Sequence, residues 1–108
     1  MTLDPQLAEI IAIAEKAGRP PLDALAPEAA RREYRKRADT FGLPEAAMTA
    51  VEERTIPGPA GAVPVRLYVP MAAARGLLVF FHGGGWTVGD RDTHDRACRY
   101  LAHEARCR

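Results

Sequence analysis

Three consecutive glycines, Gly83 to Gly85, carry the clearest chemical signal in this sequence of 108 residues. They lie in the run FFHGGGWTVGDRDTHD, directly after a stretch of apolar residues. Because glycine has no Cβ, such a run exposes its backbone N–H groups and can turn them toward an anion. We call residues 82–90 the glycine loop. Its run of glycines predicts a backbone that binds an anion. The chain contains no serine, the usual nucleophile that generates an oxyanion in acyl transfer.

Two phosphate-binding motifs share this plan of strand, glycine loop and helix, and the sequence argues against both. The P-loop requires Lys and then Ser or Thr directly after its last glycine, whereas Gly85 is followed by Trp86 and Thr87. The dinucleotide fingerprint requires spaced glycines, whereas Gly83 to Gly85 are contiguous. The remaining candidate is an oxyanion hole, in which backbone N–H groups stabilise the negative charge of a tetrahedral intermediate.

The segments around the glycine loop resemble one esterase family. HGGGW follows an apolar run and precedes GDRDTHD, and this combination resembles the hormone-sensitive-lipase-like group of bacterial esterases, members of the α/β-hydrolase superfamily. Further agreement comes from DPQLAEI near the start, GRPPL at residues 18–22 and RTIPGPAG at residues 54–61. The resemblance implies that a small-molecule carboxylic ester, short or medium in acyl chain, is hydrolysed through a serine acyl-enzyme. It implies no metal and no organic cofactor.

The resemblance also implies roles within the glycine loop. Gly84 and Gly85 would donate the hydrogen bonds to the oxyanion, and Gly83 would complete the turn. His82 would brace the loop, and Trp86 would pack beneath it. A tight turn with no ligand is the alternative that the glycines alone leave open.

The same resemblance implies a domain organisation and a fold. Residues 1–45 would form a helical cap segment, and residues 46–108 would begin the α/β-hydrolase catalytic domain. The expected α/β architecture is two cap helices, an antiparallel strand pair, a buried third strand, the oxyanion loop and a following helix, in an incomplete sheet. Tyr34 and Phe41 in the cap would line an acyl pocket, or else serve as core aromatics.

The catalytic triad of that family has no counterpart in this sequence. The family pattern continues with a nucleophile elbow and then an acid and a histidine. No GxSxG motif exists without serine, and His82, His94 and His103 all precede the place where the nucleophile would come. We therefore expect the N-terminal third of an esterase, cut by a premature stop, a frameshift or an incomplete gene model and inactive alone. The alternative is a non-catalytic product, either an inactive fragment or a small carboxylate-binding module.

Four residues near the end of the chain have the types of zinc ligands: His94, Cys98, His103 and Cys107. His94 and His103 are nine residues apart, about 900° of rotation on a helix, so the two His–Cys pairs face opposite ways. We expect no metal site. The same spacing separates the cysteines by about 13 Å along a helix, beyond the roughly 7 Å that a disulfide spans, so we expect free thiols.

Two charged clusters also admit a functional interpretation. RREYRKR, residues 31–37, suggests a nucleic-acid contact, but its charges spread around a helix, with Glu28 before Arg32 and Glu33 before Arg37 at a spacing of four. A solvated helix surface is favoured, and no nucleic-acid partner is expected. The acidic residues 90–95 are more typical of helix capping and loop bonding than of acid–base catalysis.

Helical periodicity and turn residues predict the elements that must position the glycine loop. Asp4 and Pro5 start an amphipathic helix that Gly18 stops. The other predicted elements are a helix over 27–41, antiparallel strands over 51–56 and 62–69, a strand over 76–81 and a helix from residue 92 or 93 to about 106. The strand 76–81 is apolar throughout, the pattern of a strand covered on both faces. Its family neighbours in the sheet are missing, so we expect unpaired edges and a marginal or insoluble chain.

Composition excludes several classes of protein. Apolar residues make up 47% and charged residues 27%, which is typical of a globular domain and too apolar for a disordered one. The formal net charge of +1 gives no strong attraction to nucleic acid or to an anionic membrane. No secretory signal and no apolar run of about 20 residues is present, so we expect no membrane span and a cytoplasmic location. Oligomeric state stays open.

Overall fold

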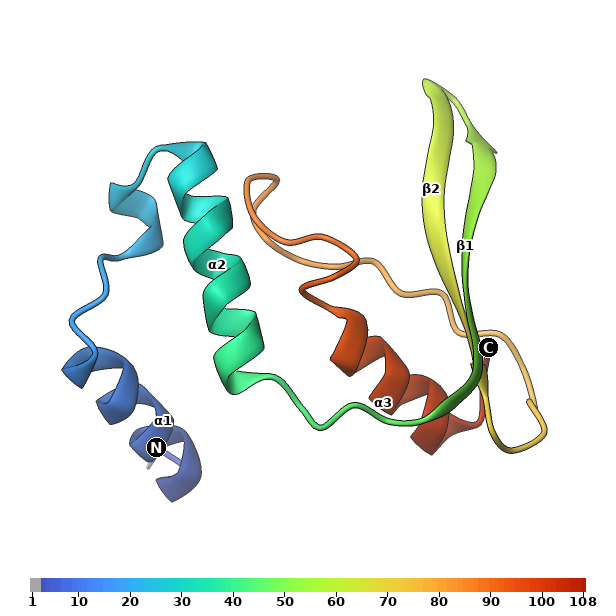
Figure 1. Cartoon of the computed structure of the whole chain (residues 1–108), viewed down its shortest axis with the longest axis horizontal. Coiled ribbons are helices and arrows are strands. Elements are labelled where there is room, and N and C mark those ends of the chain that lie inside the picture. The colour runs from blue at the N-terminus through green and yellow to red at the C-terminus, as the bar shows by residue number, and fades with distance from the viewer. Residues whose placement is uncertain (1–2) are drawn as a thin grey trace.

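The fold consists of a helical part and a hairpin part, with the glycine loop between them (Figure 1). It is known from a computed structural model that describes residues 3–108, except for the side chain of Phe41. The elements in chain order are α1 (Pro5–Lys16), a 3₁₀ turn η1 (Leu22–Ala24), α2 (Pro27–Phe41), β1 (Met48–Gly58), β2 (Gly61–Pro70) and α3 (Asp95–Ala105). This order confirms the predicted fold class, an incomplete α/β arrangement.

The start of α1 follows from its capping residues, as predicted. The Asp4 carboxylate accepts hydrogen bonds from the backbone N–H groups of Gln6 at 2.9 Å and Leu7 at 3.4 Å, and Pro5 occupies the first turn. At the other end Gly18 has a φ of 61°, which ends the helix. None of the residues of α1 is buried, so its apolar side chains contact little of the described chain.

The second helix has the predicted bounds, and its apolar residues at a spacing of four lie on one covered face. Ala30 is buried, and Tyr34 and Ala38 are half-buried on the same face. The expected pairing of Glu33 with Arg37 is present, with 3.3 Å between the carboxylate and Nε. Glu28, however, pairs with Arg31 rather than with Arg32.

The strand pair is an antiparallel hairpin that is longer than predicted. β1 and β2 pair from Met48 opposite Pro70 to Gly58 opposite Gly61. The residues of PGPAGA at both sides of the turn take part in this ladder, because Gly61 with a φ of 125° lets the chain reverse tightly.

The best-buried face of β2 is not the face of its valines and leucine. In the sequence, Val63, Val65, Leu67 and Val69 alternate with Pro64, Arg66, Tyr68 and Pro70, a pattern that predicts one buried face. The valine and leucine positions 63–69 are half-buried or exposed, whereas Tyr68 on the opposite face is only 9% exposed. The cause is electrostatic, because Arg66 and Tyr68 donate hydrogen bonds to Asp95 at the start of α3 and so hold that helix against their face.

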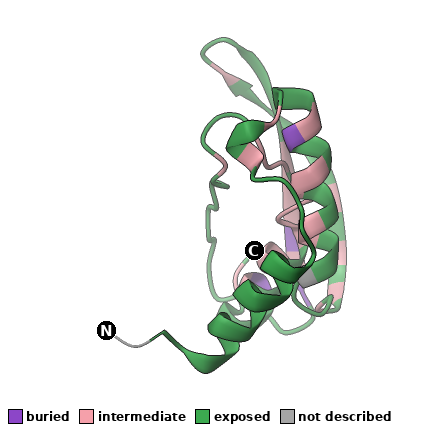
Figure 2. Cartoon of the chain, turned by 90° about the vertical axis from the view of Figure 1, so that its left-hand side faces the viewer, coloured by how far each residue is buried: buried purple, intermediate pink, exposed green. Residues whose placement is uncertain are grey.

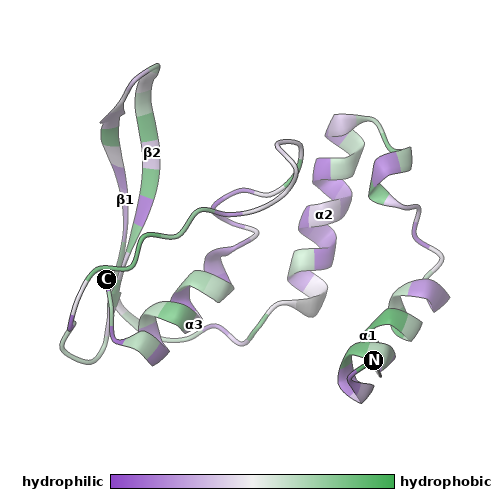
Figure 3. Cartoon of the chain, turned by 180° about the vertical axis from the view of Figure 1, so that it is seen from behind, coloured by the Kyte–Doolittle hydropathy of each residue, from purple (hydrophilic) through white to green (hydrophobic). Residues whose placement is uncertain are grey.

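The apolar segment 76–81 forms no regular strand within the described chain. Its start pairs with the chain end: Leu78 N–H donates to the Arg108 carbonyl at 2.8 Å, and Arg108 N–H donates to Gly76 at 2.9 Å. Beyond Leu78 the backbone has no hydrogen-bonded neighbour among residues 3–108. Phe81 is 87% exposed, so the expectation of a buried third strand is wrong for this chain. Figure 3 shows the segment as an apolar trace beside the hairpin.

The third helix begins later than predicted. Its first residue is Asp95, and neither Asp92 nor Thr93 caps it through a side chain. It ends at Ala105, where Arg106 has a φ of 51°. Both cysteines are free thiols, as predicted, and Cys107 lies beyond the helix end.

The described chain has little interior (Figure 2). Among the described residues, the buried apolar ones are Ala30, Tyr68, Pro70 and Ala102. The radius of gyration is 16.4 Å, whereas a compact domain of this length has about 13 Å. The described elements therefore enclose little apolar core. Among the described helices, none is long and apolar enough to cross a membrane.

Candidate functional site

The glycine loop adopts a turn that its glycines make possible. Gly84 and Gly85 have φ angles of 138° and 57°, in the region that favours glycine. The N–H groups of Thr87 and Val88 both donate to the Gly84 carbonyl, at 3.1 and 2.9 Å, and close the turn. A Cβ on Gly84 would lie 1.8 Å from the Val88 carbonyl oxygen, so the turn excludes any larger residue there.

The backbone N–H groups at the tip of this turn are not used by the protein itself. Across residues 3–108, no acceptor receives a hydrogen bond from the N–H of Gly83, Gly84, Gly85 or Trp86. Meanwhile the carbonyls of Gly84 and Gly85 accept bonds from within the loop, the second from the Thr87 hydroxyl at 3.2 Å. The loop thus uses its acceptors internally and leaves consecutive donors available, which is what an anion-binding backbone requires.

His82 and Trp86, which flank the glycines, differ in their surroundings. His82 Nδ1 lies 2.9 Å from the Gly83 carbonyl oxygen, and its ring stacks on His94 with 5.2 Å between centroids. Both contacts hold His82 to its neighbours, and its bracing role stays a prediction. Trp86 has a φ of 56° and is 105% exposed, so it packs beneath nothing in the described chain, and that expectation is wrong here.

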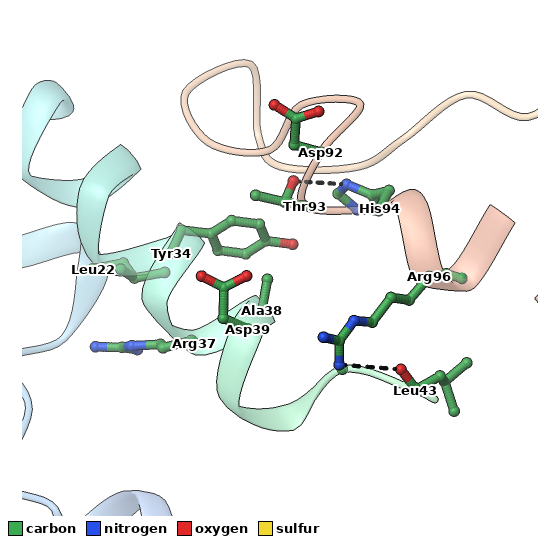
Figure 4. A pocket seen from close by; sticks show the side chains of 12 residues that line it. Leu22, Tyr34, Arg37, Ala38, Asp39, Leu43, Asp92, Thr93, His94 and Arg96 are labelled. Carbon is green, nitrogen blue, oxygen red and sulfur yellow. Dashed lines mark hydrogen bonds between the residues drawn. The ribbon is translucent and has the colours of Figure 1, made fainter. Parts of the chain in front are cut away.

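Two aromatic residues of α2 were expected to line an acyl pocket. Tyr34 borders a cavity of about 500 Å³ between α2 and residues 92–97, and its ring lies 6.3 Å from that of His94 (Figure 4). Asp39, Arg96 and Leu43 also line this cavity, so its wall is mixed in polarity. The side chain of Phe41 lies outside the described part of the structure.

Asp90, the last residue of the glycine loop, bonds to the backbone, as predicted for the acidic residues 90–95, although none of them caps α3 through its side chain. Asp90 accepts from the Thr93 N–H at 2.8 Å and pairs with Arg35 of α2. Burial opposes ionisation of Asp90, but the bond from Thr93 and the charge of Arg35 outweigh it and lower its pKa to about 2. The Asp90 carbonyl also lies 3.1 Å from His94 Nδ1. Asp90 is therefore a charged carboxylate that ties the loop to α2.

The second acidic centre joins α3 to the hairpin. The Asp95 carboxylate accepts hydrogen bonds from Arg66 at 3.0 Å, the Tyr68 hydroxyl at 2.8 Å and Arg99 at 2.6 Å. Burial would raise the pKa of Asp95, but Arg99, Tyr68 and Arg66 lower it overall. Arg66 also reaches Asp92 at 2.7 Å. This network fixes the helix that follows the glycine loop.

Sequence reasoning missed the arginines that complete these contacts. Arg31 Nε donates to the Thr87 carbonyl at 2.8 Å, and Arg35 pairs with Asp90. Both were interpreted only as part of a solvated helix surface. Their spacing of four residues, which places them on one helix face, is the signal that could have marked them. For metal binding, the part of the chain that the structure describes brings no three His, Cys, Asp or Glu side chains together.

Comparison with known proteins gives the family. A family model of the α/β-hydrolase fold matches residues 78–108. The carboxylic ester hydrolase LipN of Mycobacterium tuberculosis is 40% identical over 109 residues, which is 96% of this chain. The chain belongs to the α/β-hydrolase family. An acetyl esterase of Salmonella schwarzengrund is 33% identical over 93 residues, which is 86% of the chain.

Solved structures agree in fold with the described α/β-hydrolase chain. An ester hydrolase from the metagenome of Lake Arreo superposes with a TM-score of 0.80 at 33% identity, over 98% of this chain and 36% of that one. A hyperthermophilic esterase of Pyrobaculum calidifontis gives a TM-score of 0.81 at 29% identity, over 99% and 34%. The chain spans 28% of the mycobacterial relative and 29% of the Salmonella relative.

Proposed function

We propose that the chain supplies the cap segment and the oxyanion loop for hydrolysis of a carboxylic ester, short or medium in acyl chain. One observation carries this proposal: consecutive N–H groups of the glycine loop have no acceptor among residues 3–108, in a turn closed by the Gly84 carbonyl. The family supports the reaction class, since the mycobacterial relative is a carboxylic ester hydrolase.

In the proposed mechanism the chain stabilises the negative charge of the oxyanion. Groups outside the chain attack the ester carbonyl. The N–H groups of Gly84 and Gly85 donate to the carbonyl oxygen of the ester as it becomes an oxyanion, and Gly83 completes the turn. This interaction is stronger in the tetrahedral intermediate than in the ester, so it lowers the barrier. The attacking serine and its base lie outside this chain, which contains no serine.

The proposed domain organisation follows the contacts between the parts. Residues 1–45 form the cap segment, whose α2 meets the glycine loop through Arg31 and Arg35. Residues 46–108 begin the catalytic domain, with the hairpin and α3 joined through Asp95. Tyr34 faces the cavity between these parts and is proposed to contact the acyl group. Phe41 is proposed to do the same.

A chimera tests the proposed function. This chain replaces the matching segment of the mycobacterial carboxylic ester hydrolase, and hydrolysis of p-nitrophenyl acetate and butyrate is measured. We expect turnover by the chimera and none by the 108-residue chain alone. A chimera that folds, as judged by near-UV circular dichroism, yet hydrolyses neither ester would overturn the proposal. Turnover by the chain alone would refute the assignment of the nucleophile to residues outside it.

A further inference from the structure

Two arginines on one face of α2 reach the glycine loop from the cap side. Arg31 and Arg35 are separated by one helical turn, and α2 runs beside the loop in Figure 1. Their partners, Thr87 and Asp90, lie 56 and 55 residues further along the chain. These contacts are therefore tertiary, between the cap segment and the loop.

The contact of Arg31 acts on the turn itself. Its Nε donates to the Thr87 carbonyl at 2.8 Å, while the N–H of the same Thr87 donates to the Gly84 carbonyl at 3.1 Å. Thr87 is thus held on both sides, by α2 and by Gly84. A shift of α2 would pull on the peptide that closes the turn.

The contact of Arg35 acts on the end of the loop. Asp90, its partner, holds Thr93 through its carboxylate and lies beside His94 through its carbonyl. His94 stacks on His82, the first residue of the loop. The two ends of the loop also meet closely, because a Cβ on Gly89 would lie 2.7 Å from the Gly83 carbonyl oxygen. The ion pair therefore bears on both ends of the loop.

We propose that Arg31 and Arg35 are positioning residues that hold the glycine loop against α2 and so determine where its unused N–H groups lie. This inference rests on the proposed function for its catalytic meaning, but its structural content is independent of turnover. The arginines touch neither ester nor oxyanion in this scheme. They couple the placement of the cap segment to the geometry of the oxyanion loop.

Helix α2 offers a matched control for this proposal. Arg32 lies between the two arginines in sequence, is exposed, and makes no ion pair or side-chain hydrogen bond among the described residues. Arg32→Gln removes the same charge from the same helix as Arg31→Gln or Arg35→Gln. Any effect of helix propensity or net charge is therefore common to all three variants.

The first test uses the 108-residue chain and follows amide hydrogen exchange by NMR. We expect Arg31→Gln and Arg35→Gln each to accelerate exchange at the Thr87 and Val88 N–H groups roughly threefold, and the double variant about tenfold, as suits exposed charged contacts. Arg35→Lys, which keeps the charge, should recover most of the protection. Exchange in the two variants no faster than in Arg32→Gln would overturn the proposal.

A spectroscopic signature provides the second readout. Trp86 is the single tryptophan, so its fluorescence anisotropy reports the glycine loop without interference. Loosening the loop should lower the anisotropy in Arg31→Gln and Arg35→Gln but not in Arg32→Gln. Unchanged anisotropy in all three variants would count against the proposal.

The chimera separates this inference from the proposed function. If the loop is misplaced, kcat should fall severalfold in the Arg31→Gln/Arg35→Gln chimera while KM stays within twofold, because the oxyanion contact is made in the transition state. An active chimera with unchanged kcat would refute the positioning role and leave the proposed function standing. An inactive parent chimera would refute the proposed function. The exchange result in the chain alone would still test whether Arg31 and Arg35 position the glycine loop.

Discussion

The hairpin with α3 and the apolar segment 76–81 lie next to each other. They differ in how many of their backbone and side-chain groups find a partner within the described chain. In the first region β1 pairs with β2 along its length, and Asp95 collects Arg66, Tyr68 and Arg99. In the second region only the first residues find backbone partners, at the chain end, and Phe81 is 87% exposed. A groove of about 800 Å³ separates the two regions.

The difference shows what a strand needs beyond a strand-like sequence. A hairpin brings its own partner two residues away, and a helix closes its hydrogen bonds within itself. A parallel strand must be paired by segments distant in sequence, so its apolar pattern alone does not produce a ladder. The glycine loop follows this unpaired segment and depends on α2 and α3 for its position.

The largest expected effect concerns the turn that the glycines form. Gly84→Ala in the chimera should lower ester hydrolysis by about 10²-fold or more, because the added Cβ would meet the Val88 carbonyl oxygen at 1.8 Å and displace the donors. Gly83→Ala is the matched control, since nothing lies within 4 Å of its Cβ position and its φ is not positive. Equal losses in the two variants would show that the turn geometry is not what the reaction uses.

The second-largest effect is expected where Asp95 joins α3 to the hairpin. Asp95→Ala should destabilise α3 by about 2 kcal/mol, because it leaves Arg66, Tyr68 and Arg99 without their common acceptor. Amide exchange of α3 measures this loss. The side chain of Asp92 is 68% exposed, so Asp92→Ala should cost less than about 1 kcal/mol. A larger loss at Asp92 than at Asp95 would contradict the ranking of the two carboxylates.

The third effect is a pH dependence of the loop's attachment to α2. The pKa of Asp90 lies at about 2 in the fold, below the ordinary value of 3.8, so folding favours its ionised form. The stabilisation it provides is therefore complete above about pH 4 and is lost as the pH falls through about 2. The Thr93 amide shift, followed by NMR from pH 5 to pH 1.5, should report this midpoint. Asp90→Asn should remove the transition, and a midpoint near 4 would contradict the described bonding.

The smallest effect is expected in the unpaired segment. Phe81→Ala should change the stability of the chain by less than about 0.5 kcal/mol, because the side chain is 87% exposed and loses no buried contact. The same substitution should reduce self-association, measured by light scattering, since it removes an exposed aromatic side chain from a segment with unpaired backbone. A loss comparable with that of Asp95→Ala would mean that Phe81 is buried in solution, against the described arrangement.

Local sequence signals predicted α1 and α2 closely and the existence of the hairpin and α3, although the hairpin is longer and α3 begins later than predicted. Asp4 and Pro5 set the start of α1, and the bounds of α2 follow from Pro27 and Gly42. The turn of the glycine loop also follows from local residues, because only glycine fits at Gly84. Capping and turn formation depend on atoms a few residues apart, so the sequence displays them directly.

Contacts between distant residues could not be predicted in the same way. The attachment of Thr87 to Arg31 joins residues 56 positions apart, and Tyr68 and Asp95 are 27 apart. The alternation in β2 marked the valine face, but the Asp95 network buried the opposite face. Trp86 was expected beneath the loop and lies in solvent.

The sequence by itself determined the local elements, the glycine turn with its available donors, and the α/β-hydrolase family. Only the tertiary structure decided which face of β2 is covered and that the backbone of 76–81 stays largely unpaired. It also decided that Arg31 and Arg35 of α2 bond to the glycine loop. The physical reason is range: backbone turns and caps close within a few residues, whereas ladders, buried faces and ion pairs depend on which distant segments meet.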